Sequence, residues 1–125
     1  MIKIFVVDDD QSLQRLYSII LTEAGFEIIG TAINGKDAIE KYNDLEVKPD
    51  IILMDHRMPI KNGLDTMAEI FKINKNEKII FASADATVKK KAKSIGACAF
   101  LDKPFKIQEL LLIIHQIING LFVEY

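Results

Sequence analysis

The chain has 125 residues, and half of them are hydrophobic, which is enough for one domain with a substantial core but too little for two. Its formal net charge is −2 and no segment combines basic with aromatic residues, so the composition argues against direct binding to nucleic acid. The single cysteine, Cys98, excludes an internal disulfide, and no apolar run is long enough for a signal peptide or a bilayer span, so we expect a cytoplasmic protein without a membrane segment.

Short runs rich in β-branched residues alternate along the chain with longer runs of helical period. In chain order, the sequence predicts strands at 2–7, 26–33, 51–54, 78–82 and 97–101. The first predicted helix is 13–24 and ends at Gly25, and the second follows Asn34-Gly35 and carries Ala38, Ile39 and Tyr42. The other three predicted helices are 63–71, 86–95 and 107–118. Five such strand–helix units predict an α/β fold in which helices cover both faces of one parallel sheet.

Polar side chains follow the carboxyl ends of four of the predicted strands. Asp8 and Asp9 follow the first strand, and Asp55 follows the third. Ser83 follows the fourth strand, and Lys103 follows the fifth. Because ligands of open parallel sheets bind outside the carboxyl ends of the strands, we expect all five residues at one functional edge.

The motifs along the chain resemble, in kind and in order, those of the receiver domains of two-component response regulators. The matching motifs are VVDDD at 6–10, AxNGxxA at 32–38, DHRMP at 55–59 with Gly63 eight residues after the aspartate, FASA at 81–84 and FLDKPF at 100–105. The resemblance runs from residue 2 to about residue 119. It implies one receiver domain over 1–125 with a flavodoxin-like, doubly wound five-stranded parallel sheet in the order 2-1-3-4-5 and five helices.

The resemblance assigns an acidic metal site and a phosphoacceptor. It implies that Asp55 accepts a phosphoryl group and that Asp8, Asp9, Asp55 and the backbone carbonyl of Arg57 bind Mg²⁺. The chemistry of the residues agrees with this, because a carboxylate that attacks a phosphoryl group needs a hard dication to neutralise both partners, and carboxylates supply the oxygen ligands for Mg²⁺. Like charges about 4 Å apart cost roughly 4 kcal/mol near a protein surface, and the metal would offset this repulsion. Asp10 is instead expected to cap the following helix.

Three further residues take roles in phosphoryl transfer and switching through the resemblance. Lys103 would contact the phosphoryl group with a point charge and Ser83 with a hydroxyl. Phe100 would take the place of the switch aromatic, where Phe instead of the commoner Tyr keeps the ring and removes the hydroxyl. Phosphorylation would then change the face made by the fourth helix, fifth strand and fifth helix. The resemblance also implies a cis bond between Lys103 and Pro104.

The partners implied are those of a signalling protein and not of an enzyme with its own small-molecule substrate. A histidine kinase or a phosphotransfer protein would donate the phosphoryl group, and a downstream effector protein or output domain would read the changed face. A homodimer that forms on phosphorylation is a further expectation. The chain would assist only its own phosphorylation and dephosphorylation.

Two alternatives use the same residues differently. A haloacid-dehalogenase-type phosphatase would use Asp8 as nucleophile and Asp10 as acid and base, with Ser83 and Lys103 in support. That class needs a further acidic pair after the lysine, where only Glu109 and Glu124 follow, and it leaves the D-x-x-M-P motif unexplained. The other alternative is a receiver-like scaffold that is never phosphorylated, and it is disfavoured because no site residue is missing.

Leu112 departs from the apolar pattern of the last predicted helix. The stripe that should face the core consists of Ile107, Leu110, Leu111, Ile114, Ile117, Ile118 and Leu121. Leu112 falls about 160° from the centre of that stripe and should be exposed. The preceding helix carries Lys89, Lys90, Lys91 and Lys93. These lysines form either an ordinary solvated surface or, with Leu112, a surface for an acidic partner or a second copy of the chain.

Arg57 and Asp85 occupy equivalent places beside the predicted site. Arg57 lies two residues after Asp55, and Asp85 lies two residues after Ser83. In the family that the chain resembles, these are positions where the rate of self-dephosphorylation varies. Because they flank the same mouth from adjacent strand ends, we expect Arg57 and Asp85 to pair across it and to hinder the approach of water.

Overall fold

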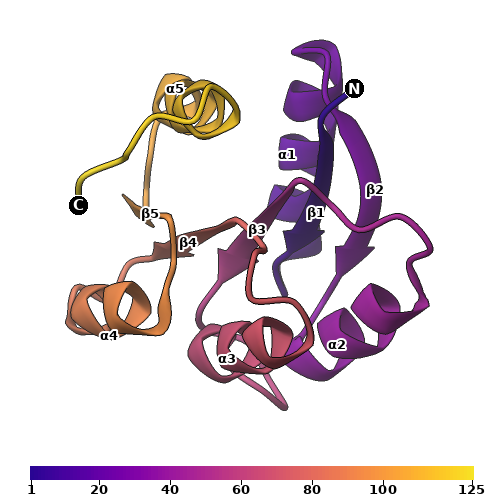
Figure 1. Ribbon diagram of the computed structural model, residues 1–125, viewed down its shortest axis with the longest axis vertical. Helices are drawn as coiled ribbons and strands as arrows, with labels where there is room; N and C mark the ends of the chain where they lie inside the picture. Colours follow the sequence, from indigo (N-terminus) through magenta and orange to yellow (C-terminus); the bar gives the residue numbers. More distant parts are fainter.

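Five parallel strands form one sheet in the order β2-β1-β3-β4-β5 in the computed structural model, which describes residues 1–125 (Figure 1). The strands are β1 (Lys3–Val7), β2 (Glu27–Ala32), β3 (Ile51–Asp55), β4 (Ile79–Ser83) and β5 (Ala99–Asp102). The helices are α1 (Gln11–Glu23), α2 (Gly35–Asp44), α3 (Gly63–Ile73), α4 (Thr87–Ile95) and α5 (Ile107–Ile118). The predicted flavodoxin-like order and the alternation of strands and helices are confirmed. The order of strands reverses between β1 and β3.

The sheet divides the core into two layers. Helices α1 and α5 cover one face, and α2, α3 and α4 cover the other (Figure 1). Because successive side chains of a strand point to opposite faces, Ile4 and Val6 of β1 pack on the side of α1 and α5, whereas Phe5 and Val7 pack on the other side. All four are almost completely buried, so β1 reads as an uninterrupted apolar run.

Side chains at the helix starts fix where the strand-to-helix turns occur. Asp10 is the N-cap of α1, as predicted, and its carboxylate accepts hydrogen bonds from the backbone N–H groups of Ser12 and Leu13 at 3.0 and 3.2 Å. Asn34 and Asn62 cap α2 and α3 in the same way. Caps of this kind each contribute about 0.5–2 kcal/mol to helix stability. They set the turns directly beside the carboxyl edge of the sheet.

The end of α5 agrees with the prediction, but Leu121 beyond it does not. The helix ends at Ile118, and Gly120 then adopts a φ of 72°, which turns the chain away from the helical path. Leu121 is consequently 60% exposed, and its assignment to the buried stripe was wrong. Leu112 is 59% exposed, as predicted. None of the five helices has the length and apolar character that crossing a membrane requires.

A buried polar pair lies at the opposite end of the sheet from the predicted site. The Tyr42 hydroxyl of α2 donates a hydrogen bond of 2.6 Å to the Glu77 carboxylate, and both side chains are almost completely buried. Burial and the hydrogen bond to Glu77 raise the pKa of Tyr42 to about 12. Burial also raises the pKa of Glu77, although the hydrogen bond from Tyr42 opposes that rise. The folded protein therefore holds a proton on Glu77 more tightly than the unfolded chain does.

This raised pKa predicts how a substitution changes the pH dependence of stability. Glu77 contributes stability that is fully present below the unfolded pKa and is lost as the pH rises through the folded pKa. Glu77→Gln removes this titration and keeps an oxygen that can accept from Tyr42. We expect the variant to gain stability over the wild type as the pH rises through that window, in urea unfolding measured at several pH values. Glu46→Gln, on the exposed loop after α2, controls for the loss of one carboxylate, and a pH-independent difference for Glu77→Gln would contradict the prediction.

Candidate functional site

Three carboxylates meet where the strand order reverses. Asp8 and Asp9 directly follow β1, and Asp55 is the last residue of the neighbouring β3. Each can offer one oxygen such that the three oxygens lie within 4.8 Å of one another. Asp8 and Asp55 are buried, whereas Asp9 is exposed. The structure therefore brings together the three acids that the sequence predicted, at the switch point of the sheet.

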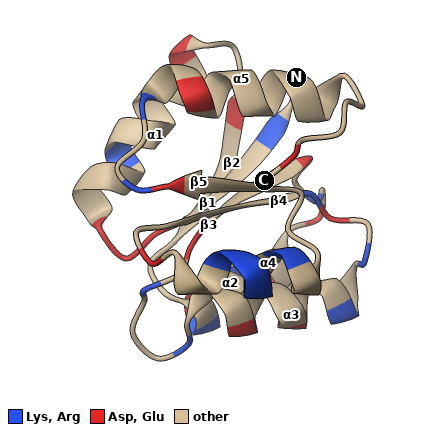
Figure 2. Ribbon diagram, turned by 90° about the vertical axis from the view of Figure 1, so that its left-hand side faces the viewer, with Lys and Arg blue, Asp and Glu red and all other residues tan.

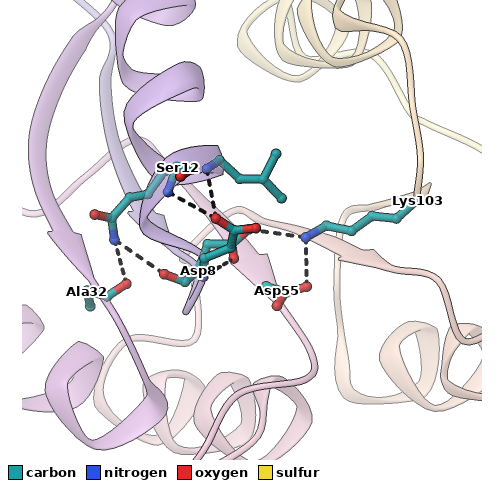
Figure 3. Close-up of polar contacts among 8 residues, drawn as sticks. Asp8, Ser12, Ala32, Asp55 and Lys103 are labelled. Carbon is teal, nitrogen blue, oxygen red and sulfur yellow. Dashed lines mark hydrogen bonds and ion pairs between the residues drawn. The ribbon is translucent and has the colours of Figure 1, made fainter.

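Lys103 bridges two of these carboxylates. Its Nζ lies 3.1 Å from Asp8 Oδ2 and 3.0 Å from Asp55 Oδ1 (Figure 3). The bond between Lys103 and Pro104 is cis, as predicted. The lysine side chain is only 19% exposed, so its ammonium group is largely withdrawn from water and directed at the acids. One ammonium partly neutralises three carboxylates, and the cluster keeps a net negative charge.

The pKa shifts report the same imbalance of charge. Burial raises the pKa of Asp55, Lys103 lowers it by attraction and hydrogen bonding, and repulsion from Asp8 and Asp9 raises it further. For Lys103, burial opposes the charged form, but attraction to Asp55 and Asp8 outweighs burial and raises the pKa of the amine. The ammonium is thus held in its charged form, while Asp55 remains an acid that lacks a full counter-charge.

The arrangement of oxygens fits a divalent cation of the magnesium type. Mg²⁺ prefers oxygen ligands at 2.0–2.1 Å, so two ligands of one ion lie at most about 4.2 Å apart. The oxygens of Asp8, Asp9 and Asp55 lie close to that range, and small rotations of the exposed Asp9 side chain would bring them within it. The donor set and the uncompensated negative charge therefore both suit a hard dication.

Gln14 supports the end of β1, and sequence reasoning missed it. This residue of α1 is buried, and its Nε2 donates hydrogen bonds to the Ala32 carbonyl at 2.8 Å and to the Asp8 carbonyl at 3.4 Å (Figure 3). It thereby ties the ends of β1 and β2 to α1. The Asp8 carboxylate is fixed in addition by the N–H of Asp10 at 2.9 Å. The signal in the sequence was a polar residue within the apolar stripe of the first helix.

Gly63 is needed because α3 begins against the backbone of Asp55. The Gly63 N–H donates a hydrogen bond of 2.8 Å to the His56 carbonyl. A Cβ atom at position 63 would lie 2.2 Å from the Asp55 carbonyl oxygen and 2.8 Å from His56 Cα, and neither of these backbone atoms can move freely. The glycine eight residues after Asp55 therefore allows the start of α3 to pack directly against the backbone that carries this carboxylate.

Ser83 lies beside the acids but bonds elsewhere. It is buried at the end of β4, and its Oγ accepts a hydrogen bond of 3.0 Å from the Asp85 N–H. The predicted pair between Arg57 and Asp85 is formed, with Arg57 Nη2 3.8 Å from Asp85 Oδ2. Hydrogen bonds from Thr87 lower the pKa of Asp85, so this partner of Arg57 is an anion at neutral pH. The Arg57 side chain is 81% exposed.

Phe100 is buried in the middle of a row of aromatic rings. It is only 6% exposed, and its ring lies 6.1 Å from that of Phe81 and 6.4 Å from that of Tyr125. The predicted switch residue therefore faces the layer of α2, α3 and α4, with Tyr125 on its outer side.

The comparisons with known proteins agree on one family over nearly the whole chain. A family model described as the response regulator receiver domain matches residues 4–115. The chain is 44% identical over 107 residues to the chemotaxis protein CheY of Thermotoga maritima, which covers 83% of this chain and 87% of that protein. It is 32% identical over 111 residues to CheY of Treponema pallidum, which covers 87% of this chain and 77% of that protein.

Solved structures show the same likeness in three dimensions. CheY in the CheX–CheY–BeF₃–Mg²⁺ complex of Borrelia burgdorferi superposes with a TM-score of 0.88 at 28% identity, over 94% of this chain and 89% of that chain. The response regulator TrrA of Thermotoga maritima, in complex with Mg²⁺ and BeF, superposes with a TM-score of 0.83 at 33% identity, over 93% and 98%. Both structures contain Mg²⁺ and a beryllium fluoride.

Proposed function

This chain belongs to the response regulator receiver domain family, and we propose that Asp55 is the residue that accepts its phosphoryl group. The observation that supports this assignment is the position of Asp55 within the acidic cluster, buried, with Lys103 3.0 Å from its carboxylate. Asp8 lies equally close to Lys103 but is fixed by the backbone of Asp10, whereas Asp55 has no backbone donor. The phosphatase alternative finds no support among the relatives or the solved structures.

The chain's own residues would divide the chemistry as follows. A carboxylate oxygen of Asp55 forms a bond to phosphorus as the bond from phosphorus to the donor's imidazole nitrogen breaks, and the leaving imidazole takes a proton. Lys103 keeps its charge beside the transferred oxygens, where its raised pKa is useful. Bound Mg²⁺, held by Asp8, Asp9, Asp55 and the carbonyl of Arg57, would supply neutralisation of the charge shared by carboxylate and phosphoryl group.

Ser83 and Phe100 would convert phosphorylation into a change of shape. The Ser83 hydroxyl would leave the Asp85 N–H and donate a hydrogen bond to a phosphoryl oxygen. Phe100 would move into the space beside β4, which alters the surface formed by α4, β5 and α5. Beryllium fluoride complexes of similar proteins support the view that such sites hold a phosphoryl-like group together with Mg²⁺.

The proposal also covers the protein that donates the phosphoryl group and the protein that recognises the altered surface. The donor would be a phosphohistidine of a kinase or phosphotransfer protein in the cytoplasm, and the reader an effector protein, an output domain or a second copy of the chain. CheY of Borrelia burgdorferi forms a complex with CheX, which shows that a similar receiver binds another protein.

The test of the phosphoacceptor uses a small phosphodonor and needs no partner. The protein is incubated with acetyl phosphate and Mg²⁺, the acyl phosphate is reduced with borohydride, and the modified residue is mapped by mass spectrometry. We expect one phosphoryl group per chain, on Asp55, and none when Mg²⁺ is removed with a chelator. A label on another aspartate, or no label from any donor of this class, would refute the assignment.

The pair of Arg57 and Asp85 predicts the lifetime of the acyl phosphate. The two side chains pair at 3.8 Å, and we infer that the pair hinders the in-line approach of water to Asp55. We expect Arg57→Ala and Asp85→Ala each to shorten the lifetime by about two- to tenfold, since each 1.4 kcal/mol or so of barrier corresponds to a factor of ten. The double variant should decay little faster than either single one. Decay of ³²P-labelled protein measures this, and unchanged lifetimes in both single variants would end the hypothesis.

A further inference from the structure

The last residues of the chain lie on the surface that the proposed switch would alter. After α5 the chain turns at Gly120, runs past the β5 edge of the sheet and ends close to α4 (Figures 1 and 2). We call residues 121–125 the tail segment. Leu121 and Phe122 are 60% and 83% exposed, so they do not hold the segment in place. Val123 and Tyr125 are partly buried and anchor it.

Tyr125 makes four contacts with α4, β5 and the turn between them. Its ring stacks on Phe100 with an interplanar angle of 17°. Lys93 Nζ of α4 lies 5.5 Å from the centre of the Tyr125 ring and donates a hydrogen bond of 3.1 Å to its carbonyl. The Tyr125 hydroxyl donates a hydrogen bond to the Ala97 carbonyl. Burial raises the pKa of Tyr125 to about 12, so the hydroxyl keeps this proton at neutral pH.

The tail segment closes an aromatic row that begins inside the core. Phe81 stacks on Phe100, which belongs to the adjacent strand in direct register, and Tyr125 stacks on the outer side of Phe100. Lys89 of α4 also lies over the Phe100 ring, with its Nζ 5.7 Å from the centre of that ring. Figure 2 shows the basic residues of α4 on the side where the chain ends. Phe100 thus packs between Phe81 and Tyr125, and a movement of its ring would alter its contact with Tyr125.

The observed position of Ser83 indicates which conformation Tyr125 favours. The Ser83 hydroxyl accepts from the Asp85 N–H and makes no hydrogen bond with Asp55. The row of Phe81, Phe100 and Tyr125 therefore coexists with the arrangement in which Ser83 is turned toward Asp85. Engaging a phosphoryl group would require Ser83 to leave that position and Phe100 to follow.

We propose that the tail segment binds intramolecularly to the surface between α4 and β5, and that the packing of Tyr125 on this surface opposes phosphorylation of Asp55. The inference rests on the proposed function of Asp55 and Phe100. Coupling between two sites is reciprocal: if a phosphoryl group at Asp55 displaces Tyr125, then removing Tyr125 must favour the phosphorylated conformation by the same factor. The tail segment would also keep partners off this surface until Asp55 is modified.

The test measures the affinity of the full chain for beryllofluoride at saturating Mg²⁺, by NMR titration of amides near Asp55. Tyr125→Ala should bind about three- to tenfold more tightly than the wild type, the range that loss of one aromatic stack and its hydrogen bonds implies. Tyr125→Phe keeps the ring and should fall between the two. Phe122→Ala, which removes a ring that is 83% exposed in the same segment, should behave like the wild type. Equal or weaker binding by Tyr125→Ala would overturn the inference.

A second measurement on the unchanged chain avoids any effect of substitution on folding. In the same titration, the ring signals of Tyr125 should move toward those of a solvent-exposed tyrosine as beryllofluoride binds. Ring signals that stay in place while the site saturates would overturn the inference and leave the role of Asp55 intact. A wild-type chain that binds no beryllofluoride at all would refute the proposed function, and the inference with it.

Discussion

Asp55→Asn is expected to lower labelling by acetyl phosphate by at least about a hundredfold, to the background of the assay. An amide oxygen is a far weaker nucleophile than a carboxylate, and the substitution also removes one ligand from the metal site. The fold should survive, because Asn fits the space of Asp and removes a carboxylate whose pKa is raised by burial and repulsion. Quantitative mass spectrometry of the intact protein measures the loss.

Asp10→Asn is the matched control for that variant. It makes the same change of side chain at the residue directly after Asp9 of the cluster, and Asn serves as well as Asp at the start of a helix, so α1 keeps its cap. Labelling of this variant should stay within about twofold of the wild type, with the reduced electrostatic field as the only difference. Undiminished label in Asp55→Asn would show that another residue accepts the phosphoryl group.

Asp9→Asn is expected to weaken Mg²⁺ binding by at least about tenfold, the lower end of what loss of a supporting group around a bound metal costs. Asp9 suits this test because it is exposed and makes no hydrogen bond that the fold needs. Isothermal titration with MgCl₂ gives the affinity. Thermal unfolding gives an independent readout, because a ligand present at a hundred times its Kd stabilises the folded state by about 2.7 kcal/mol.

Asp102→Asn separates ligation from general electrostatics. Asp102 is exposed at the end of β5, directly before Lys103, and loses the same charge close to the site. The Mg²⁺ affinity of Asp102→Asn should fall far less than the Mg²⁺ affinity of Asp9→Asn. An equal loss of affinity in both variants would indicate that Asp9 acts only through its electrostatic field. Because the pKa of Asp55 is raised, protons should begin to compete with Mg²⁺ at a higher pH than for an ordinary aspartate.

The fold could be predicted from the sequence because its central strands are buried on both faces. In β1 and β3 nearly every side chain is buried, so each strand is an apolar run rich in branched residues and is easily told from the helices. The same reading placed Asp8, Asp55 and Lys103 together, since the carboxyl ends of parallel strands share one edge. The roles of these residues came from the family resemblance, and their distances from the structure.

The features that sequence reasoning missed depend on contacts between distant segments. Gln14 acts through the carbonyl of Ala32, which lies on another strand, and no local pattern specifies that bond. The position of Tyr125 follows from the turn at Gly120, which also exposes Leu121, a residue that the sequence placed in the buried stripe. Only the folded chain shows that Tyr125 covers Phe100.

The division of the core by the sheet places the ring of Phe100 and an apolar hollow of the domain on different layers. Phe100 packs in the layer of α2, α3 and α4, whereas Leu101, the next residue, packs in the layer of α1 and α5. A hollow between α1 and Pro104 opens on that second layer and is lined mainly by apolar side chains such as Leu13 and Phe105. A molecule bound in that hollow would therefore contact the layer of α1 and α5 and not the layer in which the Phe100 ring packs.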